Sequence, residues 1–107
     1  MRPSEADAVF GIEVHSLIDT YRNEIRAIAA RRGILEVRVF GSMARGDAGE
    51  NSDVDLLVSL PPGVSGFALG GLLLDLQDLL GRRVDILTEG GLHPALRERV
   101  LGEAQTL

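Results

Sequence analysis

The sequence FGSMARG at residues 40–46, followed by SDVDLLV at residues 52–58, decides the fold class of this chain. In the second segment apolar residues alternate with Asp53 and Asp55, and alternate side chains of a strand lie on one face of its sheet. We therefore expect a strand whose two aspartates project side by side from one face. The apolar residues that we expect to pack on helices from the other face are Val54, Leu56 and Val58.

Two carboxylates so close together indicate a bound cation. At a separation of 4 Å they repel each other by roughly 1–4 kcal/mol, depending on the local dielectric, and a hard divalent cation such as Mg²⁺ removes that cost. A third carboxylate, Asp85, stands between apolar residues in the predicted strand Arg82–Leu87. If this strand pairs with the strand that carries Asp53 and Asp55, all three carboxylates converge, but the sequence alone leaves the pairing open.

The step Gly41-Ser42 predicts a turn that a phosphate group can approach. Glycine lets a ligand come close to the backbone, and the helical turn that follows presents free N–H groups and a positive dipole end. The hydroxyl of Ser42 either donates to a phosphate oxygen or only caps this short helix. Arg45 either contacts a phosphate as well or holds the turn by an ion pair, for which the candidate partners are Asp47, Glu50 and Asp53.

Helical and strand patterns surround this segment. Apolar residues recur every three to four positions from Val14 to Ala29, and Gly33 ends the predicted helix. We expect strands at Ile34–Phe40, Asp53–Leu60 and Arg82–Leu87, and further helices at Phe67–Leu80 and from His93-Pro94 through Ala104. This order predicts one α/β domain over residues 1–107, in which residues 1–12 form a flexible tail.

Composition narrows the class of protein. The 107 residues include no cysteine, which excludes disulfides and thiolate metal sites, and 45% are hydrophobic, as in soluble globular proteins. The net charge of −5 disfavours direct binding of nucleic acid, and the most apolar stretch, residues 64–80, is too short and too charged to span a membrane. An acidic chain still binds a nucleotide when divalent cations supply positive charge. We therefore expect a cytoplasmic protein.

Taken together, these residues resemble a known family. Gly41-Ser42, ten intervening residues, Asp53-Val54-Asp55 and the later strand aspartate Asp85 are similar to the motif of the nucleotidyltransferase fold in the DNA polymerase β superfamily. The fuller pattern most resembles the minimal nucleotidyltransferases of prokaryotes, over about two-thirds of the chain. The resemblance implies an α/β (α+β) fold, in which a small mixed sheet of about three strands packs with about four helices.

The resemblance also implies a reaction, the transfer of AMP from ATP onto a hydroxyl group. By position in the motif, Asp53, Asp55 and Asp85 would bind two Mg²⁺ ions and form the catalytic centre. Asp85 would also assist the deprotonation of the acceptor hydroxyl. The residues that the resemblance places at the nucleotide are Gly41, Ser42 and Arg45.

The acceptor is suggested by the size of the chain. Similar enzymes that modify antibiotics or extend RNA add a domain that holds the acceptor, and 107 residues leave no room for one. Minimal nucleotidyltransferases of this kind resemble antitoxins that transfer AMP onto a tyrosine of a partner HEPN-domain ribonuclease toxin, and we adopt this hypothesis. Two alternatives remain: a module that blocks its partner by contact alone, and an enzyme that acts on a small-molecule hydroxyl.

Overall fold

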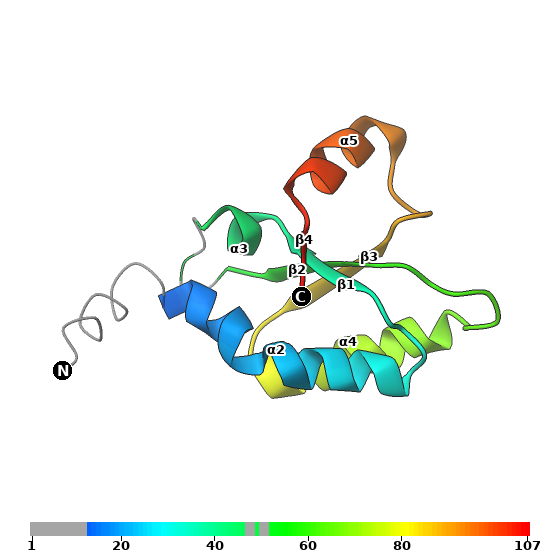
Figure 1. Cartoon of the computed structure of the whole chain (residues 1–107), viewed down its shortest axis with the longest axis horizontal. Helices are drawn as coiled ribbons and strands as arrows, with labels where there is room; N and C mark the ends of the chain where they lie inside the picture. Colours follow the sequence, from blue (N-terminus) through cyan, green and yellow to red (C-terminus); the bar gives the residue numbers. More distant parts are fainter. Residues whose placement is uncertain (1–12, 47–48, 50–51) are drawn as a thin grey trace.

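The computed structural model describes residues 13–46, 49 and 52–107 (Figure 1). The predicted tail at residues 1–12 lies outside the described residues. Within the described part, the helices are α2 (Glu13–Arg31), α3 (Ser42–Arg45), α4 (Phe67–Leu80) and α5 (Pro94–Glu103). The strands of the same part are β1 (Val37–Phe40), β2 (Val54–Val58), β3 (Val84–Thr88) and β4 (Gln105–Thr106).

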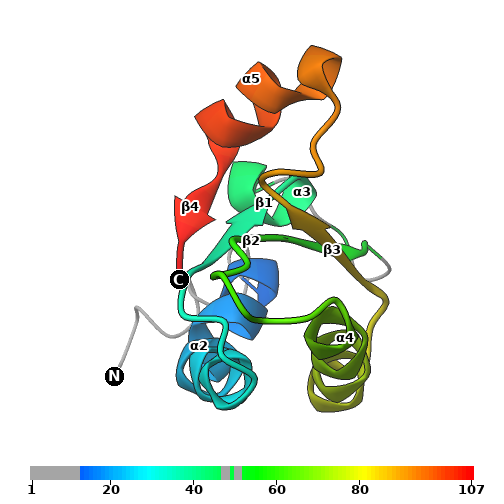
Figure 2. The same ribbon diagram turned by 90° about the vertical axis from the view of Figure 1, so that its right-hand side faces the viewer.

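The strands form one mixed sheet in the order β3-β2-β1-β4. β1 is antiparallel to both β2 and β4, whereas β2 and β3 are parallel and are connected through α4. Helices α2 and α4 lie side by side against one face of the sheet, and α5 stands on the opposite side (Figure 1, Figure 2). The predicted fold class is confirmed, with one strand more than the sequence indicated.

The main core lies between the sheet and the helix pair, because both present apolar residues there at their own period. Val54, Leu56 and Val58 of β2 are fully buried, as the alternation predicts. They meet the apolar stripes of α2 and α4, whose fully buried members are Ile25, Ala29, Leu72 and Leu76. Burial of one Val, Leu or Ile side chain contributes about 1.5–3 kcal/mol, so these contacts hold β2 firmly in place.

A second, smaller apolar cluster fixes α5 on the other face of the sheet. Phe40 of β1 and Leu57 of β2 pack there against Leu92 and Val100. This cluster brings the end of α5 close to the turn that follows β1, a proximity that matters for the site described below. In the part of the chain that the structure describes, no helix combines the length and the apolar character needed to cross a membrane.

Some predictions of local structure are wrong. The last helix ends at Glu103, one residue before the predicted end, and the chain continues as β4. Two polar residues are too few to show a period-two pattern, so the sequence did not indicate this strand. The N-cap of α3 is Gly41, without a side-chain cap, so Ser42 is the first helical residue and not the cap. Strands β1 to β3 are also somewhat shorter than or shifted from their predictions, while α4 has the predicted bounds.

Candidate active site

The aspartates of β2 and β3 lie on neighbouring strands in register. Asp55 is the partner of Asp85 in the parallel β2–β3 ladder and of Phe40 in the antiparallel β1–β2 ladder. Because Val54 and Val84 are buried in the main core, the side chains of Asp55 and Asp85 project from the other face of the sheet. Paired strands lie about 4.8 Å apart, so the strand pairing that the sequence left open places these two carboxylates next to each other.

Electrostatics join Asp53 to this pair. Asp55 is half-buried, and burial raises the pKa of its carboxyl group above the usual value. The negative charges of Asp85 and Asp53 raise the pKa of Asp55 further, and so does the more weakly acting charge of Glu103, whereas the guanidinium of Arg45 lowers it. The three aspartates therefore form one electrostatic site, in which proton uptake or a bound cation relieves the repulsion.

Gly41 brings the turn after β1 directly against this site. Its backbone has φ +74° and ψ −151°, a conformation in which other residues are strained. A Cβ atom at this position would lie 3.1 Å from Cγ of Asp55 and closer still to a carboxylate oxygen. Both the backbone conformation and the close approach thus require glycine, and the turn and the carboxylate of Asp55 are in contact.

The short helix α3 begins at this turn. The carbonyl oxygen of Gly41 accepts hydrogen bonds from the N–H groups of Ala44 and Arg45, at 3.1 and 3.0 Å. The first N–H groups of a helix have no partner within it, and here they belong to the turn that faces Asp55. Met43 and Ala44 are buried and anchor the helix, while Ser42 is half-buried. The predicted phosphate-binding residues Gly41 and Ser42 therefore lie beside the predicted metal ligands.

Arg45 has a partner that the sequence did not suggest. Its guanidinium donates to both carboxylate oxygens of Glu103, at 3.3 and 3.1 Å. The carboxylate of Glu103 also accepts a hydrogen bond from the backbone N–H of Gly41 at 3.2 Å. Two of the candidate partners, Asp47 and Glu50, lie outside the described residues. A contact of Arg45 with a phosphate stays a prediction.

The backbone before Asp53, the first aspartate, is held by Arg82, a residue that follows α4 in the sequence. The guanidinium of Arg82 donates to the carbonyl oxygens of Gly49 and Ser52, at 3.0 and 3.2 Å. The hydroxyl of Ser52 in turn accepts from the N–H of Gly49 at 2.7 Å. These bonds fix the backbone immediately before Asp53, so Arg82 helps to place the first carboxylate.

The three aspartates fit a hard divalent cation in their chemistry. Among the described residues, no three His, Cys, Asp or Glu side chains already stand in the arrangement of a metal site. The donor set nevertheless consists of carboxylate oxygens alone, and burial together with the charges of Asp85 and Asp53 raises the pKa of Asp55 despite the opposing charge of Arg45. Oxygen donors with excess negative charge suit Mg²⁺, which commonly takes one or two carboxylates together with water and phosphate. The assignment of Asp53, Asp55 and Asp85 as ligands stays a prediction.

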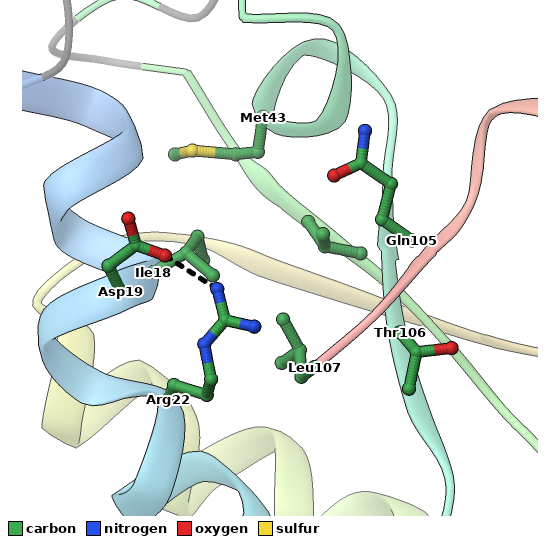
Figure 3. Close-up of a pocket in the computed structure, with 8 residues that line it drawn as sticks. Ile18, Asp19, Arg22, Met43, Gln105, Thr106 and Leu107 are labelled. Carbon is green, nitrogen blue, oxygen red and sulfur yellow. Dashed lines mark hydrogen bonds and ion pairs between the residues drawn. The ribbon is translucent and has the colours of Figure 1, made fainter.

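Figure 3 shows a pocket on the other side of α3, which does not contain these aspartates. It lies among α2, β1 and the C-terminal segment, and Met43, Arg22 and Leu107 are among its lining residues. Its volume of about 50 Å³ is far below the 300 Å³ or more of a typical small-molecule site. This pocket is therefore too small to hold a nucleotide.

Comparison with known proteins relates this arrangement to one family. The family described as nucleotidyltransferase domain matches residues 21–107. A protein of Methanocaldococcus jannaschii, provisionally named protein adenylyltransferase MJ0435, is 38% identical over 87 residues, which are 81% of this chain and 94% of that protein. Protein adenylyltransferase MntA of Thermococcus cleftensis is 37% identical over 91 residues, which are 85% of this chain and 89% of that protein.

Solved structures agree with the sequence match. A provisionally assigned minimal nucleotidyltransferase is 49% identical, with a TM-score of 0.72 over 84% of this chain and 95% of that chain. A toxin–antitoxin complex with AMP-PNP contains a chain that is 22% identical, with a TM-score of 0.68 over 78% of this chain and 69% of that chain, which shows a shared fold. By its match over residues 21–107 and by its fold, the chain belongs to the nucleotidyltransferase domain family.

Proposed function

We propose that this nucleotidyltransferase is a protein adenylyltransferase, which moves AMP from ATP onto a tyrosine hydroxyl of a HEPN-type toxin and thereby acts as its antitoxin in the cytoplasm. The observation that carries the proposal is the contact between the Gly41 turn and Asp55, with Asp85 beside it in register. The turn to which we assign phosphate binding thus lies beside the two carboxylates to which we assign cation binding. The relatives named protein adenylyltransferase support the class of reaction.

In the proposed reaction, the chain's own groups place the two reactants. The Gly41–Ser42 turn holds the triphosphate, and Asp53 and Asp55 are the carboxylates that would hold the cations beside it. The acceptor oxygen attacks the α-phosphorus of ATP, the bond from this phosphorus to the α–β bridging oxygen breaks, and pyrophosphate leaves. The hydroxyl proton passes to the carboxylate of Asp85. AMP remains on the acceptor as a phosphodiester.

Divalent cations bound by Asp53, Asp55 and Asp85 would neutralise charge on the phosphates and lower the pKa of the acceptor hydroxyl. Without them the site is strongly negative, and an ATP molecule would be repelled. Asp85 belongs to β3, an edge strand of the sheet, and its side chain is exposed. An acceptor on the surface of another protein can therefore reach the site, which favours a protein substrate over a small molecule that needs an enclosing pocket.

The toxin as partner is supported by the structures of proteins with the same fold. One of them is described as a tri-AMPylated HEPN toxin of Shewanella oneidensis in complex with an MNT antitoxin, and others are toxin–antitoxin complexes. These chains are 16–22% identical to the present one, so the partner is carried over to this chain as part of the proposal.

The test is incubation of the purified protein with a HEPN-type toxin, ATP labelled in the α-phosphate, and Mg²⁺. We expect label on the toxin, loss of its ribonuclease activity, and a mass increase of one or more AMP units at a tyrosine. The matched control is the same mixture with the Asp53→Ala, Asp55→Ala double variant, which should transfer no label.

Two results would favour the alternatives. If the double variant neutralised the toxin as well as the wild type does, contact alone would explain the inhibition. If the wild type left the toxin unlabelled and instead adenylylated a small alcohol, the protein substrate would be wrong while the nucleotidyl transfer would stand.

A further inference from the structure

A carboxylate from the end of the chain is bonded to the turn that the proposed function places at the triphosphate. Glu103, the last residue of α5, accepts from the N–H of Gly41 at 3.2 Å and from the guanidinium of Arg45 at 3.1 and 3.3 Å. The side chain of Glu103 is only 19% exposed, whereas that of Arg45 is 46% exposed. Charge-assisted hydrogen bonds that are partly shielded from water are stronger than surface ion pairs. The bond to Gly41 is partly buried and the pair with Arg45 is exposed, so Glu103 fixes the Gly41 turn more strongly than it fixes the guanidinium.

The next residues bind the other end of the same short helix. The side-chain amide of Gln105 donates to the carbonyl oxygen of Ala44 at 3.1 Å. Glu103 and Gln105 thus contact the N–H of the N-cap residue Gly41 and one of the last carbonyl oxygens of α3. A helix of four residues does not form by itself in water, so such tertiary contacts decide where the turn lies.

Glu103 is itself rigidly placed. Val100, one turn earlier in α5, packs against Phe40 and Leu57 of the sheet. Two residues later, Gln105 pairs with Val39 as β4 joins the edge of β1. The carboxylate is held between these two attachments, at a point where β1 ends and the Gly41 turn begins.

We propose that Glu103 is a positioning residue for nucleotide binding, which holds the Gly41–Ser42 turn and Arg45 at the spacing from Asp55 that grips the triphosphate of ATP. The inference rests on the proposed nucleotidyl transfer. Glu103 itself faces the backbone of the turn and the guanidinium and does not contact ATP. The test separates this role from the opposite one, in which the carboxylate occupies the place of a phosphate and leaves when ATP binds. The two roles predict opposite changes in ATP affinity.

The experiment compares Glu103→Ala and Glu103→Gln with Glu98→Gln, which removes the charge of an exposed glutamate on the same helix. Each variant is titrated with ATP in the presence of Mg²⁺ by calorimetry, and its kcat and KM are measured with the HEPN-type toxin as acceptor. We expect Glu103→Ala to raise the Kd and KM for ATP about tenfold, the effect of one lost charge-assisted contact. The KM for the toxin and the kcat should change by less than about threefold, since the aspartates remain.

The conservative variant separates positioning from general stability. Glu103→Gln keeps an oxygen that accepts from the N–H of Gly41, so it should recover a large part of the ATP affinity, while Glu98→Gln should match the wild type. In the nucleotide-free protein, amide exchange of the peptide over residues 41–45 should be faster in Glu103→Ala than in either other variant.

Four outcomes would overturn the inference. Tighter ATP binding by Glu103→Ala would show that the carboxylate competes with phosphate. Unchanged ATP affinity, with only a lower melting temperature, would show a role in folding alone. If the wild type neither bound ATP nor transferred AMP, the proposed function would fail and this inference with it, whereas a wild type that does both beside an unaffected Glu103→Ala would sink the inference only.

Discussion

The two faces of the sheet differ in the side chains that they present, although the same strands form both: one is apolar, and the other carries the aspartates. On the face toward α2 and α4, every residue that β2 presents is apolar and fully buried, and none of the buried side chains that the structure describes is charged. On the other face, the same strand carries Asp55, in register with Asp85 on β3. Helix α5 covers only part of this face, where its Val100 packs with Leu57 of β2. The face toward the helices thus contributes most of the buried apolar contacts, whereas the opposite face holds carboxylates that repel one another.

The difference shows how a small domain tolerates a costly site. A half-buried carboxylate beside two others is destabilising, and the domain can carry it only because the strands are held from behind by apolar contacts. The predictions below test this division by changing neighbouring residues that face opposite ways, from the largest expected effect to the smallest.

Asp55→Asn should separate function from folding most clearly. Loss of this carboxylate removes a cation ligand and should lower the rate of AMP transfer at least about a thousandfold, equivalent to roughly 4 kcal/mol. The protein should remain folded, because an amide of the same shape replaces the charge. The measurement is the initial rate of toxin labelling, with the exposed Asp78→Asn on α4 as the control. A variant that unfolds, or one that transfers AMP at the wild-type rate, would contradict the division between the faces.

Leu56→Ala, one residue further along the strand, should instead lower the stability of the domain. Leu56 is 0% exposed, and truncation of a fully buried leucine costs about 2–5 kcal/mol in the free energy of unfolding. Urea unfolding followed by circular dichroism measures this loss. Leu74→Ala, at a leucine that is 65% exposed, should change the free energy of unfolding by less than about 0.5 kcal/mol. Equal losses in both variants would mean that the helix-facing side is not the stabilising one.

Gly41→Ala should affect both stability and activity, because Gly41 connects the strand end to the site. Gly63 offers a control: its φ of +88° is also positive, so a side chain there is strained as well, but a Cβ there meets no atom within 4 Å. We expect Gly63→Ala to cost about 1–2 kcal/mol without loss of transfer. Gly41→Ala should cost more, since its Cβ displaces the carboxylate of Asp55, and should lower the transfer rate at least about tenfold. Equal losses of stability and of transfer rate in the two variants would show that the close approach of Gly41 to Asp55 has no effect on either.

The smallest effect concerns pH. The pKa of Asp55 is raised in the folded state above its ordinary value of 3.8, so the native protein binds more protons than the unfolded chain in that range. Stability should therefore fall as pH rises from about 3.8 through the raised pKa. Because the carboxyl group of Asp55 is partly exposed, we expect the melting temperature to fall by only a few degrees over this range. Asp55→Asn should remove this fall. Added Mg²⁺ should also reduce it, because cation binding releases the proton. A melting temperature that rises over this pH range in the wild type would contradict a raised pKa of Asp55 in the folded protein.

Much of the fold and of the candidate site could be predicted from local patterns. The alternation around Val54 and Leu56 gave the direction of Asp55 correctly, and the apolar period and Gly81 gave the bounds of α4. The short strand β4 could not be predicted, because Gln105 and Thr106 pair with β1 only where α5 delivers them. For the same reason, the sequence suggested nearby acids as partners of Arg45 and did not suggest Glu103, which is 58 residues away.

The sequence by itself determined which residue types stand at which short spacings: a glycine and a serine after one strand, two aspartates on one face of the next, and a lone aspartate in a third. These features follow from the periods of strands and helices, which depend on neighbours in the chain. Only the tertiary structure decided that β3 lies parallel to β2 with Asp85 in register with Asp55, and that Glu103 reaches the Gly41 turn. Contacts between residues tens of positions apart depend on how whole layers pack, and no local pattern encodes that packing.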